Sequence, residues 1–161
     1  WSSDVCSSDL RILSEIATCA AHDAAISILI VDVDYFKKYN DNYGHPEGDR
    51  CLALLGNSLR ESLTRDNQIV ARYGGEEFAL ILPDTDIQEA LRLAQTIIRN
   101  VFSLQIAHAF SPFGRVTVSV GISTARAVDI AGSQQNIIIA ADQALYQAKR
   151  AGRNRYAFVG V

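Results

Sequence analysis

The stretch RYGGEEF, residues 72–78, lies between two apolar runs, residues 68–71 (QIVA) and residues 78–82 (FALIL). Two glycines between such runs predict a β-hairpin, because the tight turns that join paired strands favour positive φ angles. A hairpin needs only the glycines, so the adjacent carboxylates of Glu76 and Glu77 call for another explanation. Glycines let a phosphate approach the backbone, and neighbouring carboxylates can hold a divalent cation that neutralises it. The alternative is an ordinary turn with two solvated acids at its base.

A second pair of acids follows the most apolar stretch of the chain. Residues 25–33, AISILIVDV, form a continuous run that is typical of a central strand buried on both faces. Because side chains alternate along a strand, Asp32 and Asp34 point to the same face. Open α/β sheets bind ligands at the ends of their strands, which makes this position suitable for a site. The structural alternative is that Asp34 caps a helix beginning near Phe36.

The other hydrophobic periodicities predict alternating helices and strands. In chain order, they are a helix at 10–20, a short helix at 35–43, a helix at 46–63, a helix at 86–101, a strand at 115–124, a helix at 136–151 and a strand at 154–159. A hairpin requires antiparallel pairing, whereas helical crossovers favour parallel pairing. We therefore expect an α+β or α/β fold, with a mixed β-sheet flanked by helices.

The bulk composition is that of an ordinary globular domain. The chain has 161 residues, 48% of them hydrophobic, with a net charge of −3 and a pI near 5.5. This charge argues against nucleic acid as the main partner, and the longest apolar run is too short to cross a membrane. The scattered cysteines Cys6, Cys19 and Cys51 favour a reducing, cytoplasmic setting. Residues 1–10, which repeat Ser-Ser-Asp, are expected to be a non-native or disordered segment before a domain at 11–161.

If the two acid-bearing strands are neighbours, three or four carboxylates converge and require a divalent cation. Hard oxygen ligands suit Mg²⁺, with phosphate completing its coordination. Asn40 and Asp49 add an amide and a carboxylate, the groups that a guanine edge requires, although Asp49 in a first helical turn also compensates a helix dipole. Phosphates would be met by three basic side chains, Lys37, Lys149 and Arg153.

Four blocks of the sequence, in order, resemble the GGDEF domain, the catalytic domain of diguanylate cyclases. They are DVDYFKKYND at 32–41, YGHPEGD at 43–49, ARYGGEEF at 71–78 and ADQALYQAKRAGRNR at 141–155, with a weaker VSVGIS at 118–123. The resemblance covers the chain from about residue 25 to its end. It implies a polymerase-palm or nucleotidyl-cyclase-like fold. It also implies condensation of two GTP molecules into cyclic di-GMP with release of two pyrophosphates.

The resemblance assigns roles to residues at the matching positions. Two Mg²⁺ ions per active site, or Mn²⁺ instead, would be held by Asp32, the Val33 carbonyl and Glu76. Glu76 or Glu77 would help deprotonate the attacking 3′-hydroxyl, and Lys37 would stabilise charge on the phosphates. The remaining substrate contacts would be Phe36, Asn40, His45, Asp49, Gly74, Gly75, Lys149 and Arg153. Asn40 and Asp49 would read guanine. Lys149 and Arg153, expected one helical turn apart, would meet the terminal phosphates, whereas Lys38 and Arg150 are interpreted as solvated surface charges.

The resemblance also implies partners, because each domain holds one GTP and two copies must face each other as a homodimer. An upstream sensory or receiver domain usually sets that geometry. The family's usual opening stretch D-x-L-T-G-L-x-N-R has no counterpart here. The family's product-inhibition motif R-x-x-D is degenerate, since Arg65 is kept and Gln68 replaces the acid. Two alternatives to a cyclase remain: a domain that only binds GTP or cyclic di-GMP to regulate a partner, and a receiver-like phosphorylation module.

Overall fold

The computed structural model describes residues 14, 18, 24–126, 129 and 134–160. The helix predicted at 10–20 and the first ten residues fall outside the continuous described part of the chain. Within the described residues, the elements follow the expected order of strand, two helices, hairpin, helix, strand, helix and strand.

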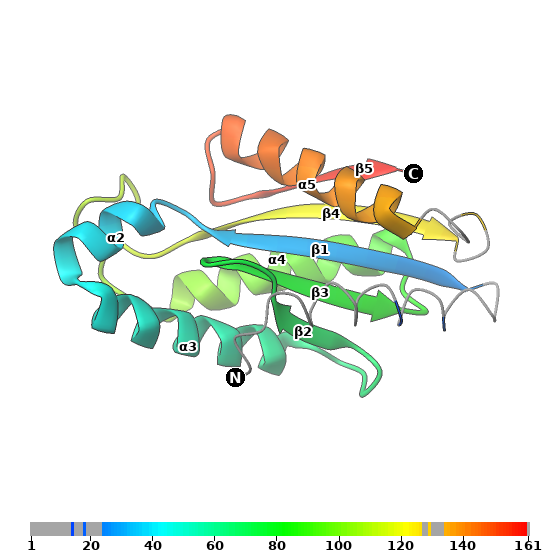
Figure 1. The fold of residues 1–161 in the computed structure, drawn as a ribbon, viewed down its shortest axis with the longest axis horizontal. Helices are drawn as coiled ribbons and strands as arrows, with labels where there is room; N and C mark the ends of the chain where they lie inside the picture. Colours follow the sequence, from blue (N-terminus) through cyan, green and yellow to red (C-terminus); the bar gives the residue numbers. More distant parts are fainter. Residues whose placement is uncertain (1–13, 15–17, 19–23, 127–128, 130–133, 161) are drawn as a thin grey trace.

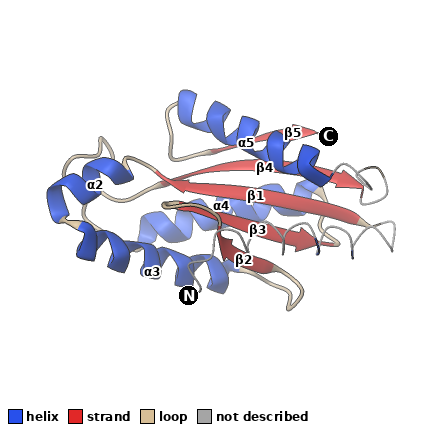
Figure 2. Ribbon diagram, in the orientation of Figure 1, coloured by secondary structure: helices blue, strands red, loops and turns tan. Residues whose placement is uncertain are grey.

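A five-stranded mixed sheet forms the centre of the molecule (Figures 1 and 2). Its strand order is β2-β3-β1-β4-β5, with bounds β1 Ala25–Val33, β2 Ile69–Arg72, β3 Glu77–Pro83, β4 Val118–Arg126 and β5 Tyr156–Gly160. β1 pairs antiparallel with both β3 and β4, and β2 pairs antiparallel with β3. β5 runs parallel to β4, so the prediction of a mixed sheet is confirmed.

The central position of β1 explains its unbroken apolar sequence. Leu29, Val31 and Val33 join one hydrophobic core, while Ile26, Ile28 and Ile30 join a second core on the opposite face. Both faces of this strand are therefore withdrawn from water, which is the condition under which a strand is apolar at every position rather than at every second one.

Helices cover the two faces of the sheet. The first face is covered by α3 (His45–Ser62) and α4 (Ile87–Ser103), and the second by α5 (Gln134–Arg150), as Figure 2 shows. The short helix α2 (Phe36–Tyr43) lies beyond the end of β1. No helix in the described ranges is long and apolar enough to cross a membrane.

The close approach of α5 to β4 depends on Gly121. A Cβ atom at this position would lie 2.1 Å from the carbonyl oxygen of Ala141 and 2.3 Å from the amide nitrogen of Leu145. Both are backbone atoms of α5, so any larger residue would push the helix away from the sheet.

The hairpin that joins β2 to β3 differs from the prediction in its turn. Four residues, 73–76, connect the strands, and neither Gly74 nor Gly75 adopts the positive φ that a two-residue turn requires. The amides of Tyr73 and Gly74 both donate to the Glu77 carbonyl, at 2.8 and 3.2 Å. The longer loop reverses the chain without left-handed backbone, so the reason given for the two glycines was wrong.

Candidate active site

Three of the four acids considered, Asp32, Glu76 and Glu77, come together at the end of the sheet where β1 ends and β3 begins, because their strands are neighbours. Asp32 pairs in register with Glu77, and the Val33 amide donates to the Glu76 carbonyl at 3.3 Å. The antiparallel β1–β3 ladder thus brings together two motifs that lie far apart in the sequence. Asp32 is only 5% exposed, so its carboxylate sits in a largely desolvated position.

Desolvation dominates the electrostatics of this acid cluster. Burial raises the pKa values of Asp32, Glu76 and Glu77 above the usual range of their carboxyl groups. Repulsion between neighbouring acids raises the same pKa values further, and the positive charge of Lys149 lowers them in part. The acids are therefore held in an arrangement that favours uptake of positive charge.

Lys149 supplies a positive charge at the cluster itself. Its Nζ atom lies 2.9 Å from Oδ2 of Asp32, so the last turn of α5 reaches across to β1. The expected partner Arg153 is not on that helix, because α5 ends at Arg150 and Arg153 has a left-handed backbone with φ of 64°. The expectation that Lys149 and Arg153 lie one helical turn apart was wrong. Arg153 instead places its guanidinium 4.7 Å from the centroid of the Tyr35 ring.

The hairpin turn is held against the same cluster. Gly74 lies so close to Glu77 that a Cβ atom would meet Oε2 of that residue at 2.8 Å, whereas Gly75 is exposed and a Cβ there would meet nothing within 4 Å. Arg72 folds over the turn and donates to the carbonyls of Gly74 and Gly75 at 3.3 and 2.6 Å. The absence of a side chain at Gly74 therefore lets the Glu77 carboxylate pack against the turn.

A second group of predicted residues lies at the corner between α2 and α3. Asn40 packs against Gly48, where a Cβ atom would overlap the Asn40 side chain and lie 3.3 Å from the Phe36 ring. The Asn40 Oδ1 atom is buried without a hydrogen-bond partner. Such an atom needs a donor that the protein does not provide, and a bound ligand can supply one.

The remaining predicted contacts occupy the rim of this corner. Lys37 is exposed on α2, and His45 and Asp49 are exposed on α3. The acid in the first turn of α3 is Glu47, so the expectation that Asp49 lies in that turn was wrong. Phe36, which was also expected to contact substrate, is buried and stacks on Tyr39 at a centroid distance of 5.9 Å. Because residues 34 and 35 join β1 directly to α2, this corner follows the acid cluster along the chain.

Asp34 and Asp142 depart from what the sequence suggested. Asp34 does not cap α2, since the residue before that helix is Tyr35 and it makes no side-chain cap. Its carboxylate accepts hydrogen bonds from Thr117 and Ser119 instead. Asp142, on α5, joins the acid cluster unexpectedly: burial raises its pKa, and its charge helps to raise that of Glu77. A single acid on an amphipathic helix carries no local signal of such a position.

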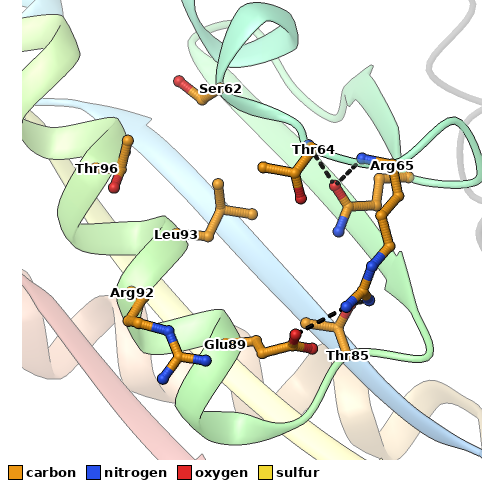
Figure 3. A pocket seen from close by; sticks show the side chains of 9 residues that line it. Ser62, Thr64, Arg65, Thr85, Glu89, Arg92, Leu93 and Thr96 are labelled. Carbon is orange, nitrogen blue, oxygen red and sulfur yellow. Dashed lines mark hydrogen bonds and ion pairs between the residues drawn. The ribbon is translucent and has the colours of Figure 1, made fainter.

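Arg65 lines a separate pocket of about 210 Å³ between α3, α4 and the hairpin (Figure 3). Its guanidinium donates to the Asp84 carbonyl at 2.8 Å, to Thr85 Oγ1 at 3.2 Å and to Glu89 Oε1 at 2.8 Å. Gln68, which stands where the family motif has an acid, accepts from the backbone amides of Thr64 and Arg65. Glu89 of α4 therefore provides the carboxylate partner of Arg65.

The acid cluster is suited in kind to a divalent metal. Asp32, Glu76 and the Val33 carbonyl offer only oxygen donors, which Mg²⁺ and Mn²⁺ accept readily. Among the described residues, no three acidic, histidine or cysteine side chains already lie close enough to enclose a metal ion. Lys149 already neutralises the negative charge of Asp32. A metal ion bound to this carboxylate would therefore have to displace the Lys149 ammonium group.

Comparison with known proteins agrees with this geometry. Residues 7–155 match the family described as diguanylate cyclase, GGDEF domain. Diguanylate cyclase DgcM of Escherichia coli is 43% identical over 129 residues, which are 80% of this chain and 30% of DgcM. Response regulator PleD of Caulobacter vibrioides is 39% identical over 132 residues, 80% of this chain and 28% of PleD. The chain thus spans less than a third of either relative.

Solved structures show the same fold. The GGDEF domain of DgcB from Caulobacter crescentus, in complex with c-di-GMP, has a TM-score of 0.81 at 29% identity, covering 93% of this chain and 86% of that one. The active GGEEF domain of a diguanylate cyclase from Vibrio cholerae has a TM-score of 0.74 at 30% identity, covering 90% and 89%. A receiver-like module has a parallel, doubly wound sheet, so that alternative is wrong. The chain belongs to the GGDEF family of diguanylate cyclases.

Proposed function

We propose that this domain joins two GTP molecules into cyclic di-GMP, releasing two pyrophosphates, with each of two facing copies holding one GTP. The observation that carries the proposal is the β1–β3 register, which sets Asp32 opposite Glu77 and joins Val33 to Glu76. The names of the curated relatives and the intact acid pair support it. The relatives are much longer than this chain, which fits an upstream sensory or receiver domain.

Asp32, Glu76 and the Val33 carbonyl would hold two Mg²⁺ ions, with Mn²⁺ as the alternative. When bound, the metal would offset phosphate charge and lower the pKa of the attacking 3′-hydroxyl. The high pKa values of the carboxyl groups support this assignment, because burial that penalises an unneutralised carboxylate makes cation binding more favourable.

Glu77 is suited to accept the proton of the attacking hydroxyl. Its pKa is raised by burial and by the neighbouring acids, which makes it a stronger base than an exposed glutamate once it is ionised. Lys149, Lys37 and Arg153 would contact phosphate oxygens, and Lys149 would then exchange Asp32 for a phosphate as its anionic partner. Gly74 and Gly75 would let the substrate approach the turn without a steric clash.

The corner between α2 and α3 would recognise guanine. The unpaired Asn40 Oδ1 can accept from the base, and Asp49 can accept from the two adjacent N–H groups of the guanine edge. Gly48 leaves the space that the Asn40 side chain itself fills beside the Phe36 ring, and this packing would fix the amide that meets the base edge. His45, at the start of α3, would lie at the edge of the bound nucleotide.

We also propose that feedback by product at Arg65 is weak in this chain. The Arg65 guanidinium is already bonded to Glu89, Thr85 and the Asp84 carbonyl, and Gln68 uses its side-chain oxygen on backbone amides. A product that binds here must displace these contacts. The cytoplasmic setting expected from the cysteine content remains a prediction.

The test is turnover of GTP with Mg²⁺ over a range of protein concentrations, with products identified by mass spectrometry. Glu76→Gln and Glu77→Gln remove one charge each without changing side-chain size, and Glu61→Gln, on the exposed face of α3, is the matched control. We expect cyclic di-GMP to form with a rate that rises more than linearly with enzyme. Formation should be lost in both cluster variants and kept in the control.

Other outcomes separate the alternatives. Tight GTP binding without product at any concentration would favour a domain that binds nucleotide only to regulate a partner. A rate strictly proportional to enzyme concentration, over a range in which sedimentation shows the protein to be monomeric, would contradict the need for two facing copies. If neither product nor binding of GTP is detected in a folded sample, the proposed function is wrong.

A further inference from the structure

Asp34 is a buried carboxylate for which the proposed chemistry has no use. The residue is 1% exposed, and three donors surround it. Its Oδ1 accepts from Ser119 Oγ at 2.7 Å, while Oδ2 accepts from Thr117 Oγ1 at 2.7 Å and from the Asn154 backbone amide at 3.0 Å. Its own amide donates to the Thr117 carbonyl at 2.9 Å. One side chain thus joins the end of β1, the start of β4 and the turn between α5 and β5.

The turn that Asp34 grips has an unusual backbone. Gly152, Arg153 and Asn154 have φ angles of 123°, 64° and 49°, three consecutive residues in the positive region. Positive φ is uncommon for residues other than glycine and persists only where surrounding contacts hold it. The Arg153 amide is satisfied from within, by the Ala148 carbonyl at 3.1 Å. The Asn154 amide is satisfied from outside the turn, by Asp34.

This turn presents Arg153 toward the start of α2. The Arg153 guanidinium lies over the Tyr35 ring, and Tyr35 is the residue that follows Asp34 and enters α2 with φ of 57°. Asp34 therefore holds the turn that carries Arg153 and lies next to the segment on which Arg153 rests. A change in the Asp34 contacts would move Arg153 relative to β1. Because the charge of Asp34 also acts on Asp32, the test compares two substitutions that both remove this charge.

We propose that Asp34 is a positioning residue, which holds the turn at 152–154 so that Arg153 faces the triphosphate of bound GTP. This inference rests on the proposed function, since it takes GTP as the ligand. Asp34 acts through the backbone of Asn154 and does not contact substrate. Its loss should weaken recognition of the phosphates and leave recognition of the base, which lies with Asn40, nearly intact.

Two substitutions at Asp34 distinguish hydrogen bonding from a general effect on stability. In Asp34→Asn, the amide oxygen can accept from Thr117 and Asn154, while the amide nitrogen donates to Ser119, whose hydroxyl can accept. Asp34→Ser keeps a polar group near the two hydroxyls, but its side chain is too short to reach the Asn154 amide.

Ser27→Ala is the matched control for loss of a buried polar contact on the same strand. Ser27 is buried near the opposite end of β1, where its Oγ donates to the Thr85 carbonyl at 2.8 Å and lies 2.6 Å from Thr124 Oγ1. Its removal should lower stability without any effect on the turn at 152–154.

The measurement compares the dissociation constants of a slowly hydrolysed GTP analogue and of GMP, by calorimetry with Mg²⁺ present. Loss of one charge-assisted contact corresponds to about tenfold in affinity. We expect Asp34→Ser to weaken binding of the GTP analogue about tenfold and binding of GMP less than about twofold. Asp34→Asn should stay within about threefold of the wild type for both, and Ser27→Ala should leave the ratio unchanged. Hydrogen exchange at the Asn154 amide should be slow in the wild type and in Asp34→Asn, and fast in Asp34→Ser.

Each other outcome overturns the inference. Equal weakening of both nucleotides in Asp34→Ser would indicate a purely structural role. If Asp34→Ser does not fold, two other results would contradict the inference. One is fast hydrogen exchange at the Asn154 amide in the wild type. The other is a folded Asp34→Asn in which the Asn154 amide is protected but the preference for the GTP analogue over GMP is lost. If the wild type binds both nucleotides and Asp34→Ser binds them equally well, only this inference is rejected. If the wild type binds neither nucleotide, the proposed function is rejected as well.

Discussion

Replacement of Gly121 by alanine should destabilise the domain more than any ordinary surface change. The added Cβ would lie 2.1 Å from the Ala141 carbonyl oxygen and 2.3 Å from the Leu145 amide nitrogen. Non-bonded carbon atoms favour separations of about 3.5–4.0 Å, so α5 must move outward by about 1 Å or more. Neither contact can be relieved by a side-chain rotation, because both atoms belong to the helix backbone.

Overpacking of a buried site costs about 1–3 kcal/mol, and this contact belongs at the upper end. Replacing glycine by alanine also restricts the unfolded chain, which returns about 0.4–1 kcal/mol. The net loss is then about 2 kcal/mol, and at about 2–4 °C per kcal/mol the melting temperature of Gly121→Ala should fall by about 4–8 °C. Because α5 also carries Lys149, the shift should loosen its ion pair with Asp32 and weaken GTP binding.

Thermal unfolding followed by circular dichroism measures this effect, and Gly160→Ala is the control. A Cβ at Gly160, at the end of β5, would meet nothing within 4 Å, so that variant should melt within about 2 °C of the wild type. A melting temperature of Gly121→Ala that matches the control would refute the argument that α5 is pressed against β4 at this position.

Three further outcomes are expected. Gly48→Ala should displace the Asn40 side chain and weaken guanine-nucleotide binding at least about tenfold in calorimetry, while the fold stays stable because alanine favours a helix by about 1 kcal/mol; unchanged binding would contradict the base site. Burial raises the pKa of the Asp142 carboxyl from 3.8, so the folded state loses stability as pH rises above that value. In EDTA, the melting temperature of Asp142→Asn should therefore exceed that of the wild type by an amount that grows with pH; a difference that shrinks would contradict this. Glu89→Gln breaks a half-exposed ion pair with Arg65 and should lower the free energy of unfolding in urea by less than about 1 kcal/mol. Calorimetry should show tighter binding of cyclic di-GMP to this variant, and unaltered binding would mean that Glu89 does not compete for Arg65.

The central strand and its helices could be predicted because their signals are local. The unbroken apolar run gave β1 its observed bounds, Ala25–Val33, and helical periodicity located α3, α4 and α5 within a few residues. The convergence of the acids was predicted only on the condition that their two strands are neighbours, and the pairing of Asp32 with Glu77 meets that condition. Each of these features follows from burial and side-chain alternation, which the order of residues records directly.

The features that were missed depend on three-dimensional packing. Asp142 reaches the acid cluster because α5 packs tightly on β4 at Gly121, a distance that no periodicity encodes. The positive φ angles after α5 move Arg153 off the helix; Gly152 signals the end of that helix in the sequence, but not the path that the chain takes beyond it. Glu89 pairs with Arg65 across two elements, and neither residue signals the other in the sequence.

The position of β1 between β3 and β4 has a consequence for synthesis on the ribosome. The strand is synthesised before its partners Glu77–Pro83 and Val118–Arg126. At about 5–20 residues per second, its nine largely apolar residues wait several seconds for the second partner, with both backbone edges open to association with other chains. Ser27 and Asp32 are the polar residues within that run, and polar or charged residues within an apolar strand disfavour such association. The carboxylate that we propose as a metal ligand would thus also disfavour aggregation of the nascent chain.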